Sequence, residues 1–177
     1  NCNASGSNFH EINGNKIINA GQYGIQMLTS SGSGSAYGQI YNNMIGGGFR
    51  NTSTIYGISD NSSRYQIYHN SINMDFNASV AYCINLTGGS LHDIKNNHLV
   101  IGASAVPVAY PLNSTASSYI SLLDNNNYYT NSGFVLVSIG SGQYTASNFQ
   151  TAFPNGGGTG SISLNPFYTS NTNLHTS

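Results

Sequence analysis

The chain has 177 residues, of which only 5% are charged, with four Lys or Arg against five Asp or Glu; an ordinary soluble domain has about 25%. Nucleic acid and anionic lipid are recognised through clustered Lys and Arg, so this composition excludes both as partners. No run approaches the ~18 apolar residues that span a bilayer, so we expect no membrane insertion.

Residues 1–7 are interpreted as a lead-in from a longer chain, because they lack an initial Met and carry no repeat. We therefore expect further coils of the same polypeptide upstream. The two cysteines are Cys2 and Cys83, three repeats apart. A disulfide between them would need the N-terminal tail to fold back, and two unpaired thiols are the simpler interpretation.

From residue 12 onward, one pattern returns at nearly constant spacing: aliphatic, two residues, Asn, one residue, aliphatic. It occurs four times, and its asparagines are separated by 28, 27 and 27 residues: Asn15, Asn43, Asn70 and Asn97. A less regular fifth copy follows at 122–128. A constant period of about 20–50 residues is typical of solenoid proteins.

Each repeat contains a second apolar element, built around a tyrosine: Tyr23, Tyr56, Tyr82 and Tyr110. Apolar and polar residues alternate there with a period of two, which indicates short strands bounded by Gly, Asn and Ser. Strands without helices between them exclude leucine-rich and ankyrin repeats, and the repeat is too short for a propeller blade. The sequence therefore predicts an all-β fold, a parallel β-helix of about five coils over residues 8–130.

The column of asparagines has a structural explanation. A turn between strands leaves backbone groups that no strand pairing satisfies. Asn adopts the left-handed turn conformation and bonds to nearby backbone, and amides stacked about 4.8 Å apart can also bond to one another. We therefore predict that Asn15, Asn43, Asn70 and Asn97 form a structural ladder, with the flanking aliphatic residues stacked inside the coils.

Residues 131–177 are expected to form a final coil and a cap. The segment 145–153 is the best helix candidate, with Thr145 as its N-cap. Its apolar face would consist of Phe149, Ala152 and Phe153. Since the end of a solenoid exposes unpaired strands, we expect this short helix and the Gly-rich loop after it to cover the last coil.

The Ile-x-x-Asn-x-Ile repeat over residues 8–130 resembles the right-handed parallel β-helix repeat of pectate-lyase-like proteins. The motifs of the closing stretch, from 124–129 through 161–167 to 173–175, are similar in order to the end of β-helix domains in large secreted surface proteins of Bacteroidota. The resemblance implies a right-handed coil and an extracellular or cell-surface location.

The pectate-lyase-like family includes polysaccharide lyases and hydrolases, which use acidic clusters with a basic residue or close-set aspartates. Glu11 and Asp93 share a column here, but three coils place them roughly 14 Å apart. Paired carboxylates of glycosidases lie about 5–9.5 Å apart. Asp60 and Asp75 would meet only if loops from different strands converge. We therefore predict no catalytic residue.

Metal-binding residues are equally scattered. His10 and His92 share a column three coils apart and could not bind one metal together. No zinc-site spacing occurs in the sequence. We predict no metal site and no cofactor, apart from a weak calcium site that backbone and Asn carbonyls could form near Asp60-Asn61 or Asp124-Asn125.

The chain has 13 tyrosines and no tryptophan. Exposed aromatic rings can stack on sugars, so the candidates for glycan contact are Tyr37, Tyr41, Tyr65 and Tyr68. The simpler alternative is that these side chains are half-buried in the coil wall with their hydroxyls outward.

The leading functional hypothesis is a non-catalytic segment of a large extracellular protein. It would act as a structural stalk or adhesin-like module with weak binding to a polysaccharide or cell-surface glycan. The alternative is a fragment of a polysaccharide lyase or glycoside hydrolase whose active site needs coils upstream of residue 1. An ice-binding β-helix ranks last, because the strand columns carry Gln, Ser and Asn where a Thr array is needed.

Overall fold

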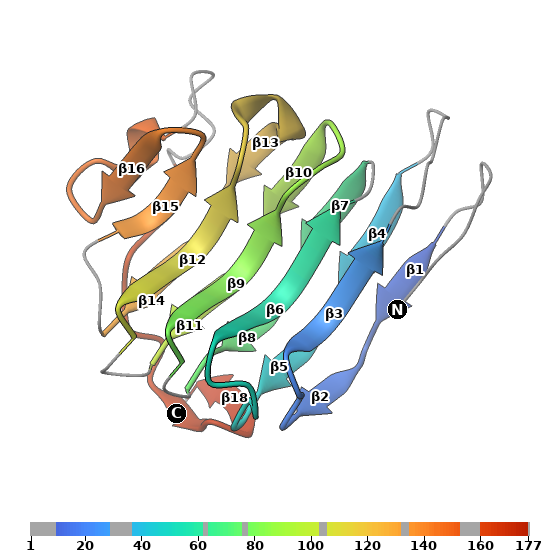
Figure 1. The fold of residues 1–177 in the computed structure, drawn as a ribbon, viewed down its shortest axis with the longest axis vertical. Helices are drawn as coiled ribbons and strands as arrows, with labels where there is room; N and C mark the ends of the chain where they lie inside the picture. The colour runs from blue at the N-terminus through green and yellow to red at the C-terminus, as the bar shows by residue number, and fades with distance from the viewer. Residues whose placement is uncertain are drawn as a thin grey trace.

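The computed structural model describes residues 10–28, 37–61, 64–75, 78–102, 106–131, 135–152 and 160–176. These residues form an all-β parallel solenoid whose helix content consists of two 3₁₀ turns. Each coil contributes one strand to each of three walls, and parallel strands stack along every wall (Figure 1). The predicted parallel β-helix is confirmed. The predicted five coils correspond to five stacked strands per wall, which span about four turns.

The walls are named in the order in which the chain visits them. The first wall contains β1 (Glu11–Asn13), β4 (Gly38–Tyr41), β7 (Tyr65–Tyr68), β10 (His92–Lys95) and β13 (Ile120–Asp124). The second contains β2 (Lys16–Ile18), β5 (Met44–Gly46), β8 (Ser71–Asn73), β11 (His98–Ile101) and β14 (Asn127–Thr130). The third contains β3 (Tyr23–Leu28), β6 (Thr54–Asn61), β9 (Val80–Leu86), β12 (Val108–Ser114), β15 (Val135–Ile139) and the antiparallel β16 (Gly142–Thr145). The remaining elements are the 3₁₀ turns η1 (Ser117–Tyr119) and η2 (Phe149–Thr151) and the hairpin β17 (Tyr168–Ser170) and β18 (Asn173–Thr176).

The core consists of aliphatic columns, because the register is kept from coil to coil. The first-wall column is Ile12, Ile40, Ile67, Ile94 and Leu123. The second-wall column is Ile17, Ile45, Ile72, Leu99 and Tyr128. All but the first member of each column are buried, so the predicted interior stacking is confirmed.

The turn between the first and second walls uses two adjacent columns with different roles. The outer column has positive φ angles, between 51° and 64°: Gly14, Asn42, His69, Asn96 and Asn125. The inner column is the Asn ladder: Asn15, Asn43, Asn70, Asn97 and Asn126. The expectation that the ladder residues themselves adopt the left-handed conformation is wrong, because the residue before each of them turns the chain.

Each ladder amide bonds along the axis and back to the backbone. Asn70 Nδ2 donates to Asn97 Oδ1 at 3.0 Å. It also donates to the backbone carbonyls of Ile40 and Tyr68, at 2.9 and 3.1 Å. Asn70 Oδ1 accepts the backbone and side-chain N–H groups of Asn43 at 3.1 and 3.0 Å. The predicted ladder is confirmed, and its aligned amides polarise one another along the coil axis.

The ladder ends on a serine of the closing segment. Asn97 Nδ2 donates to Asn126 Oδ1, and the backbone N–H of Asn126 donates to Ser161 Oγ, both at 3.0 Å. Asn126 and Ser161 are fully buried. The segment 160–167 crosses the end of the last coil, where Ile162 bridges Asn127. A hydroxyl thus takes the place of the next amide.

Replacing Ser161 with Ala is expected to lower the free energy of unfolding by about 1–2 kcal/mol, because the buried N–H of Asn126 loses its acceptor. Urea unfolding followed by circular dichroism measures the change. Ser163→Ala on the same segment is the control, and we expect it to stay within about 0.5 kcal/mol of the wild type. Equal stability of the two variants would contradict a role for Ser161 in ending the ladder.

The strand pairing of the third wall is interrupted directly after its tyrosine column. Tyr23, Tyr56, Tyr82 and Tyr110 pair in register, with neighbouring ring centroids 4.8–5.8 Å apart. The register then skips one position in each coil: Gly24, Gly57, Cys83 and Pro111. Proline has no N–H to donate, so it is tolerated in the middle of a strand where this pairing is interrupted.

Cys83 occupies this unpaired position as a free, buried thiol. Its Sγ donates to the carbonyl of Val100 at 3.2 Å. Burial raises the pKa of the Cys83 thiol well above its ordinary value, so the side chain stays protonated and serves packing. Cys2 lies outside the described residues.

The predicted helix over 145–153 is wrong. Thr145 is the last residue of β16 and pairs with Val135 of β15. Its N–H donates to Asn148 Oδ1 at 2.7 Å, so a turn replaces the first turn of a helix. Within the described residues, the one helical element after Thr145 is η2, a single 3₁₀ turn.

The apolar residues of that segment nevertheless cover the last coil as expected. Phe149 and Ala152 are buried. The ring of Phe149 packs edge-on against Tyr128, with centroids 5.8 Å apart. Phe153 and the Gly-rich loop after it lie outside the described residues. The cap therefore consists of the β15–β16 hairpin and η2, and the Phe149 ring packs between this cap and the last coil.

The C-terminal hairpin returns along the second wall towards the N-terminal coils, and β18 lies near β5 and β8 (Figure 1). Gly47 donates its N–H to the carbonyl of Asn171 at 2.6 Å. Leu174 is buried in this contact.

Within the described part of the chain, no helix has the length and apolar character needed to cross a membrane.

Candidate functional site

The outward side chains of the first wall form a regular grid. In each of its first four strands, one outward residue precedes an inward aliphatic residue and one follows it. The strand register stacks these outward residues in two columns. One column contains Glu11, Gln39, Gln66 and Asp93. The other contains Asn13, Tyr41, Tyr68, Lys95 and Asp124. We call the centre of the grid, Gln39, Tyr41, Gln66 and Tyr68, the Gln-Tyr face.

The Gln-Tyr face repeats the same two side chains on adjacent coils. The rings of Tyr41 and Tyr68 are stacked, with centroids 5.0 Å apart and planes within 1°. Gln39 Nε2 donates to Gln66 Oε1 at 2.9 Å. Each ring covers one face of the other, so a ligand would meet hydroxyls, amides and ring edges. Tyr41 and Tyr68 therefore form a pair on the outward side of the first wall.

Glu11 orients Tyr41 at the N-terminal end of the grid. The Tyr41 hydroxyl and Asn13 Nδ2 both donate to the Glu11 carboxylate. The hydrogen bond to Glu11, followed by burial and the Glu11 charge, raises the pKa of the Tyr41 phenol. The Tyr41 phenol therefore stays protonated to a higher pH than an ordinary tyrosine, with its proton directed towards Glu11.

Tyr65 does not belong to this surface, and its interpretation as a glycan contact is wrong. Its side chain is 1% exposed and lies inside the coil, where a hydrogen bond of 3.0 Å joins its hydroxyl to His10 Nδ1. The residue opposite is Gly38, and a β-carbon there would lie 2.2 Å from the Tyr65 ring. The missing side chain of Gly38 thus makes room for the ring.

Tyr37 lies next to β4 and is half-buried. The guanidinium of Arg64 lies 4.5 Å from the centre of the Tyr37 ring and donates to its hydroxyl at 3.0 Å. Arg64 therefore already covers one face of this ring. Of the four candidate tyrosines, the structure brings only Tyr41 and Tyr68 together.

Asp93 and Asp124 lie on adjacent coils and are the closest pair of acids in the grid. Glu11 lies three coils from Asp93, as predicted. Asp124 pairs with Lys95, so its Cα lies diagonally from that of Asp93, about 8 Å away. Both carboxylates have structural partners. Asp124 accepts N–H groups of Asn125 and Gly160 at 2.9–3.1 Å, and Asp93 accepts the hydroxyl of Ser121.

Asp60 and His92 meet in the interior. His92 Nδ1 lies 3.6 Å from Asp60 Oδ2 and accepts the N–H of Tyr65 at 3.0 Å. An accepting Nδ1 places the ring proton on Nε2, which lies 3.4 Å from the carbonyl of Gly88. Asp60 and His92 are fully buried, so the weak calcium site predicted at Asp60-Asn61 lacks an accessible carboxylate. Among the described residues, no three His, Cys, Asp or Glu side chains are grouped to hold a metal ion.

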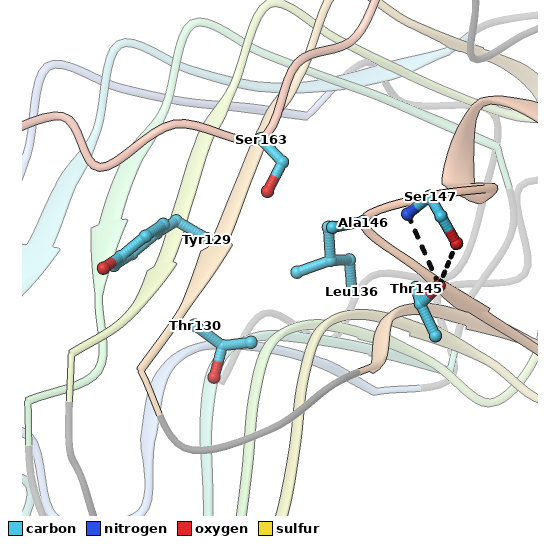
Figure 2. A pocket seen from close by; sticks show the side chains of 7 residues that line it. All are labelled: Tyr129, Thr130, Leu136, Thr145, Ala146, Ser147 and Ser163. Atoms are coloured by element: carbon cyan, nitrogen blue, oxygen red, sulfur yellow. Dashed lines mark hydrogen bonds between the residues drawn. The ribbon is translucent and has the colours of Figure 1, made fainter.

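A cavity of about 620 Å³ opens at the C-terminal end of the solenoid (Figure 2). Its lining comes from β14, β15, β16 and the closing segment: Tyr129, Thr130, Leu136, Thr145, Ala146, Ser147 and Ser163. The hydroxyls of Thr145 and Ser147 bond to each other at 2.9 Å. The size suits a small ligand, but these lining residues include no carboxylate, His, Lys or Arg for acid–base chemistry.

No family model, curated protein or solved structure matches the chain. A function therefore has to be inferred from the geometry of the surface itself.

Four residues important to this geometry are absent from the sequence-based predictions. Gln39 and Gln66 are identified by the repeated Gln-x-Tyr pattern of β4 and β7. Asn126 continues the ladder with the same spacing as the other four, three residues after the aliphatic Leu123. Ser161 has no comparable signal, because its role depends on how the closing segment crosses the last coil.

Proposed function

We propose that the chain is a non-catalytic β-solenoid segment of an extracellular protein and binds neutral glycans through the Gln-Tyr face. The observation that carries this proposal is the repetition of Gln39-Ile40-Tyr41 as Gln66-Ile67-Tyr68, in register on adjacent coils. Coils are about 4.8 Å apart, close to the length of one sugar ring. Successive sugars of an extended chain would thus meet the same two side chains.

The chemistry of the face suits a ligand rich in hydroxyls. Amides and phenol hydroxyls both donate and accept hydrogen bonds. The bond between Gln39 and Gln66 uses one N–H and one carbonyl. Within the described residues, the Gln66 amide nitrogen and the Gln39 side-chain carbonyl have no other hydrogen-bond partner and could bond to a ligand. The outward ring edges of Tyr41 and Tyr68 would contact the C–H groups of a sugar.

Charge favours a neutral glycan over an acidic one. The grid contains Glu11, Asp93 and Asp124 against the single Lys95. A polyanion would be repelled by this balance.

A stack of coils with internal ladders and few surface charges also suits a stalk or adhesin-like module. The resemblance to β-helix domains of pectate-lyase-like proteins, including secreted surface proteins of Bacteroidota, supports an extracellular or cell-surface location. It also supports further coils of the same polypeptide upstream.

A glycoside hydrolase is the second candidate, favoured by the diagonal placement of Asp93 and Asp124. The carboxyl groups of inverting hydrolases lie about 6.5–9.5 Å apart, and a Cα separation of about 8 Å would allow such a spacing. A hydrolase would release reducing ends from a polysaccharide and lose that activity in Asp93→Asn and Asp124→Asn variants. The proposed binding function expects no release from the wild type.

Replacing Tyr41 and Tyr68 together with Ala is expected to weaken binding to neutral polysaccharides about tenfold or more. Each aromatic contact contributes about 0.5–1.5 kcal/mol, and 1.4 kcal/mol corresponds to about a factor of ten. Affinity gel electrophoresis against neutral and acidic polysaccharides measures the loss. The control is the double variant Tyr23→Ala, Tyr56→Ala, which removes a stacked pair, 4.8 Å apart, from the third wall.

The control protein should bind like the wild type. Equal weakening in both double variants, or binding to acidic polysaccharides alone, would overturn the proposal.

A further inference from the structure

A separate pocket of about 320 Å³ lies where the second wall ends and the C-terminal hairpin packs against it. The chain contributes to it from three successive coils and from the closing segment. The residues relevant here are Asn73, Asp75, Gly102, Asn131, Tyr129 and Tyr168. The Gln-Tyr face belongs to a different wall, so the two sites are distinct.

Asn73 provides a buried acceptor in this pocket. The side chain of Asn73 is 7% exposed, and within the described part of the chain no donor reaches its Oδ1. A buried acceptor without a donor costs about 1–3 kcal/mol. Such an atom in a native fold therefore indicates a bound group that satisfies it.

The Asp75 carboxylate lies beside this acceptor. A β-carbon placed on Gly102 would lie 3.2 Å from Asn73 Oδ1 and 3.6 Å from Asp75 Oδ1. Both oxygens thus face the space that the missing side chain of Gly102 leaves. Asn131 Nδ2 donates to the Gly102 carbonyl at 2.9 Å and fixes this corner. Asp75 itself is exposed, so its carboxylate can turn towards an ion.

We propose that this pocket binds a divalent cation of the calcium class, with the Asp75 carboxylate and Asn73 Oδ1 as protein ligands. The described lining contains no Lys, Arg or His that would neutralise Asp75. Carboxylate and amide oxygens are the ligands that calcium prefers, and water completes its 6–8 oxygens. A site with one carboxylate is weak, with a dissociation constant of about 10⁻⁴–10⁻³ M. The site differs from the two positions expected from the sequence, Asp60-Asn61 and Asp124-Asn125.

Terbium luminescence tests this site, because Tyr129 and Tyr168 line the pocket and can sensitise a bound terbium ion. Titrating the full chain with terbium chloride alone should give tyrosine-sensitised emission that millimolar calcium chloride displaces. Asp75→Asn should weaken terbium binding by about tenfold or more. Gly102→Ala should weaken it as well without a change of charge, because the added carbon fills the space. The control is Asp93→Asn, which removes an acid from the first wall and should bind like the wild type.

Thermal unfolding gives a second readout. Calcium should raise the Tm of the wild type and leave that of Asp75→Asn unchanged. Equal terbium emission from the wild type and Asp75→Asn would overturn the proposal, and so would equal losses in Asp75→Asn and Asp93→Asn. A neutral monosaccharide that raises the Tm through Asp75 where calcium does not would identify a sugar pocket and also overturn it.

Discussion

Asn70→Ala is expected to lower the free energy of unfolding by about 3–5 kcal/mol. Asn70 is fully buried in the middle of the ladder. Its loss leaves the carbonyl of Ile40 and the N–H of Asn43 without partners inside the coil. Each buried polar group left unsatisfied costs about 1–3 kcal/mol, and the interrupted chain of amides loses its mutual polarisation.

Urea unfolding followed by circular dichroism measures this loss, and Asn15→Ala is the matched control. Asn15 makes the same side-chain bond to its neighbour, at 2.9 Å, but is exposed at the first coil. Water can replace its partners, so we expect a loss of about 1 kcal/mol or less. If the two variants were equally stable, burial of the ladder would not contribute to the stability of the coil.

Gly57→Ala is expected to lower the free energy of unfolding by at least about 3 kcal/mol. A β-carbon on Gly57 would lie 2.6 Å from the backbone carbonyl oxygen of Cys83 and 2.6 Å from Ile72 Cγ2. The first contact is with the backbone of the next coil, which cannot rotate away. Overpacking of this kind costs about 1–3 kcal/mol or more, because the stack must shift to relieve it.

Gly21→Ala is the control for this prediction. No atom lies within 4 Å of a β-carbon at Gly21. Its unfolding free energy should stay within about 1 kcal/mol of the wild type, since alanine restricts the unfolded chain slightly. Thermal unfolding of both variants at one protein concentration makes the comparison. A wild-type Tm for Gly57→Ala would contradict the close approach of neighbouring coils at Gly57.

The repeated part of the fold is predictable from sequence because the same contact recurs at every coil. The spacing of Asn43, Asn70 and Asn97 predicts both their stacking and the burial of the flanking isoleucines. The side chains of a column contact one another only if neighbouring coils keep the same register. A constant period in the sequence therefore indicates which residues stack on adjacent coils. The same reasoning extends to Asn126, whose spacing from Leu123 matches the repeat.

Predictions are wrong where the contact partner does not repeat. The apolar spacing over 145–153 fits a helix, but β16 pairs with β15 and removes Thr145 from it. Tyr65 is a candidate for glycan contact from its residue type, yet it lies on the same side of β7 as the inward Ile67, and the space beside Gly38 of the preceding coil admits its ring. Both outcomes depend on neighbouring strands, and local propensity cannot report such packing.

The candidate sites also differ in whether the sequence predicts them. Stacking of Tyr41 and Tyr68 follows from the period of the repeat and is predictable. The pocket at Asn73 and Asp75 is not, because its lining joins three coils to the C-terminal hairpin. Sequence position alone does not indicate that Gly102 leaves space between the two oxygens.

Nuclear magnetic resonance of the isotope-labelled chain, titrated with a neutral oligosaccharide, tests the proposed function most directly. The side-chain amide signals of Gln39 and Gln66 should shift with saturable concentration dependence. The signals of the buried ladder residue Asn70 should stay in place, and the oligosaccharide should remain intact. Shifts confined to another wall, or cleavage of the oligosaccharide during the titration, would contradict glycan binding by the Gln-Tyr face.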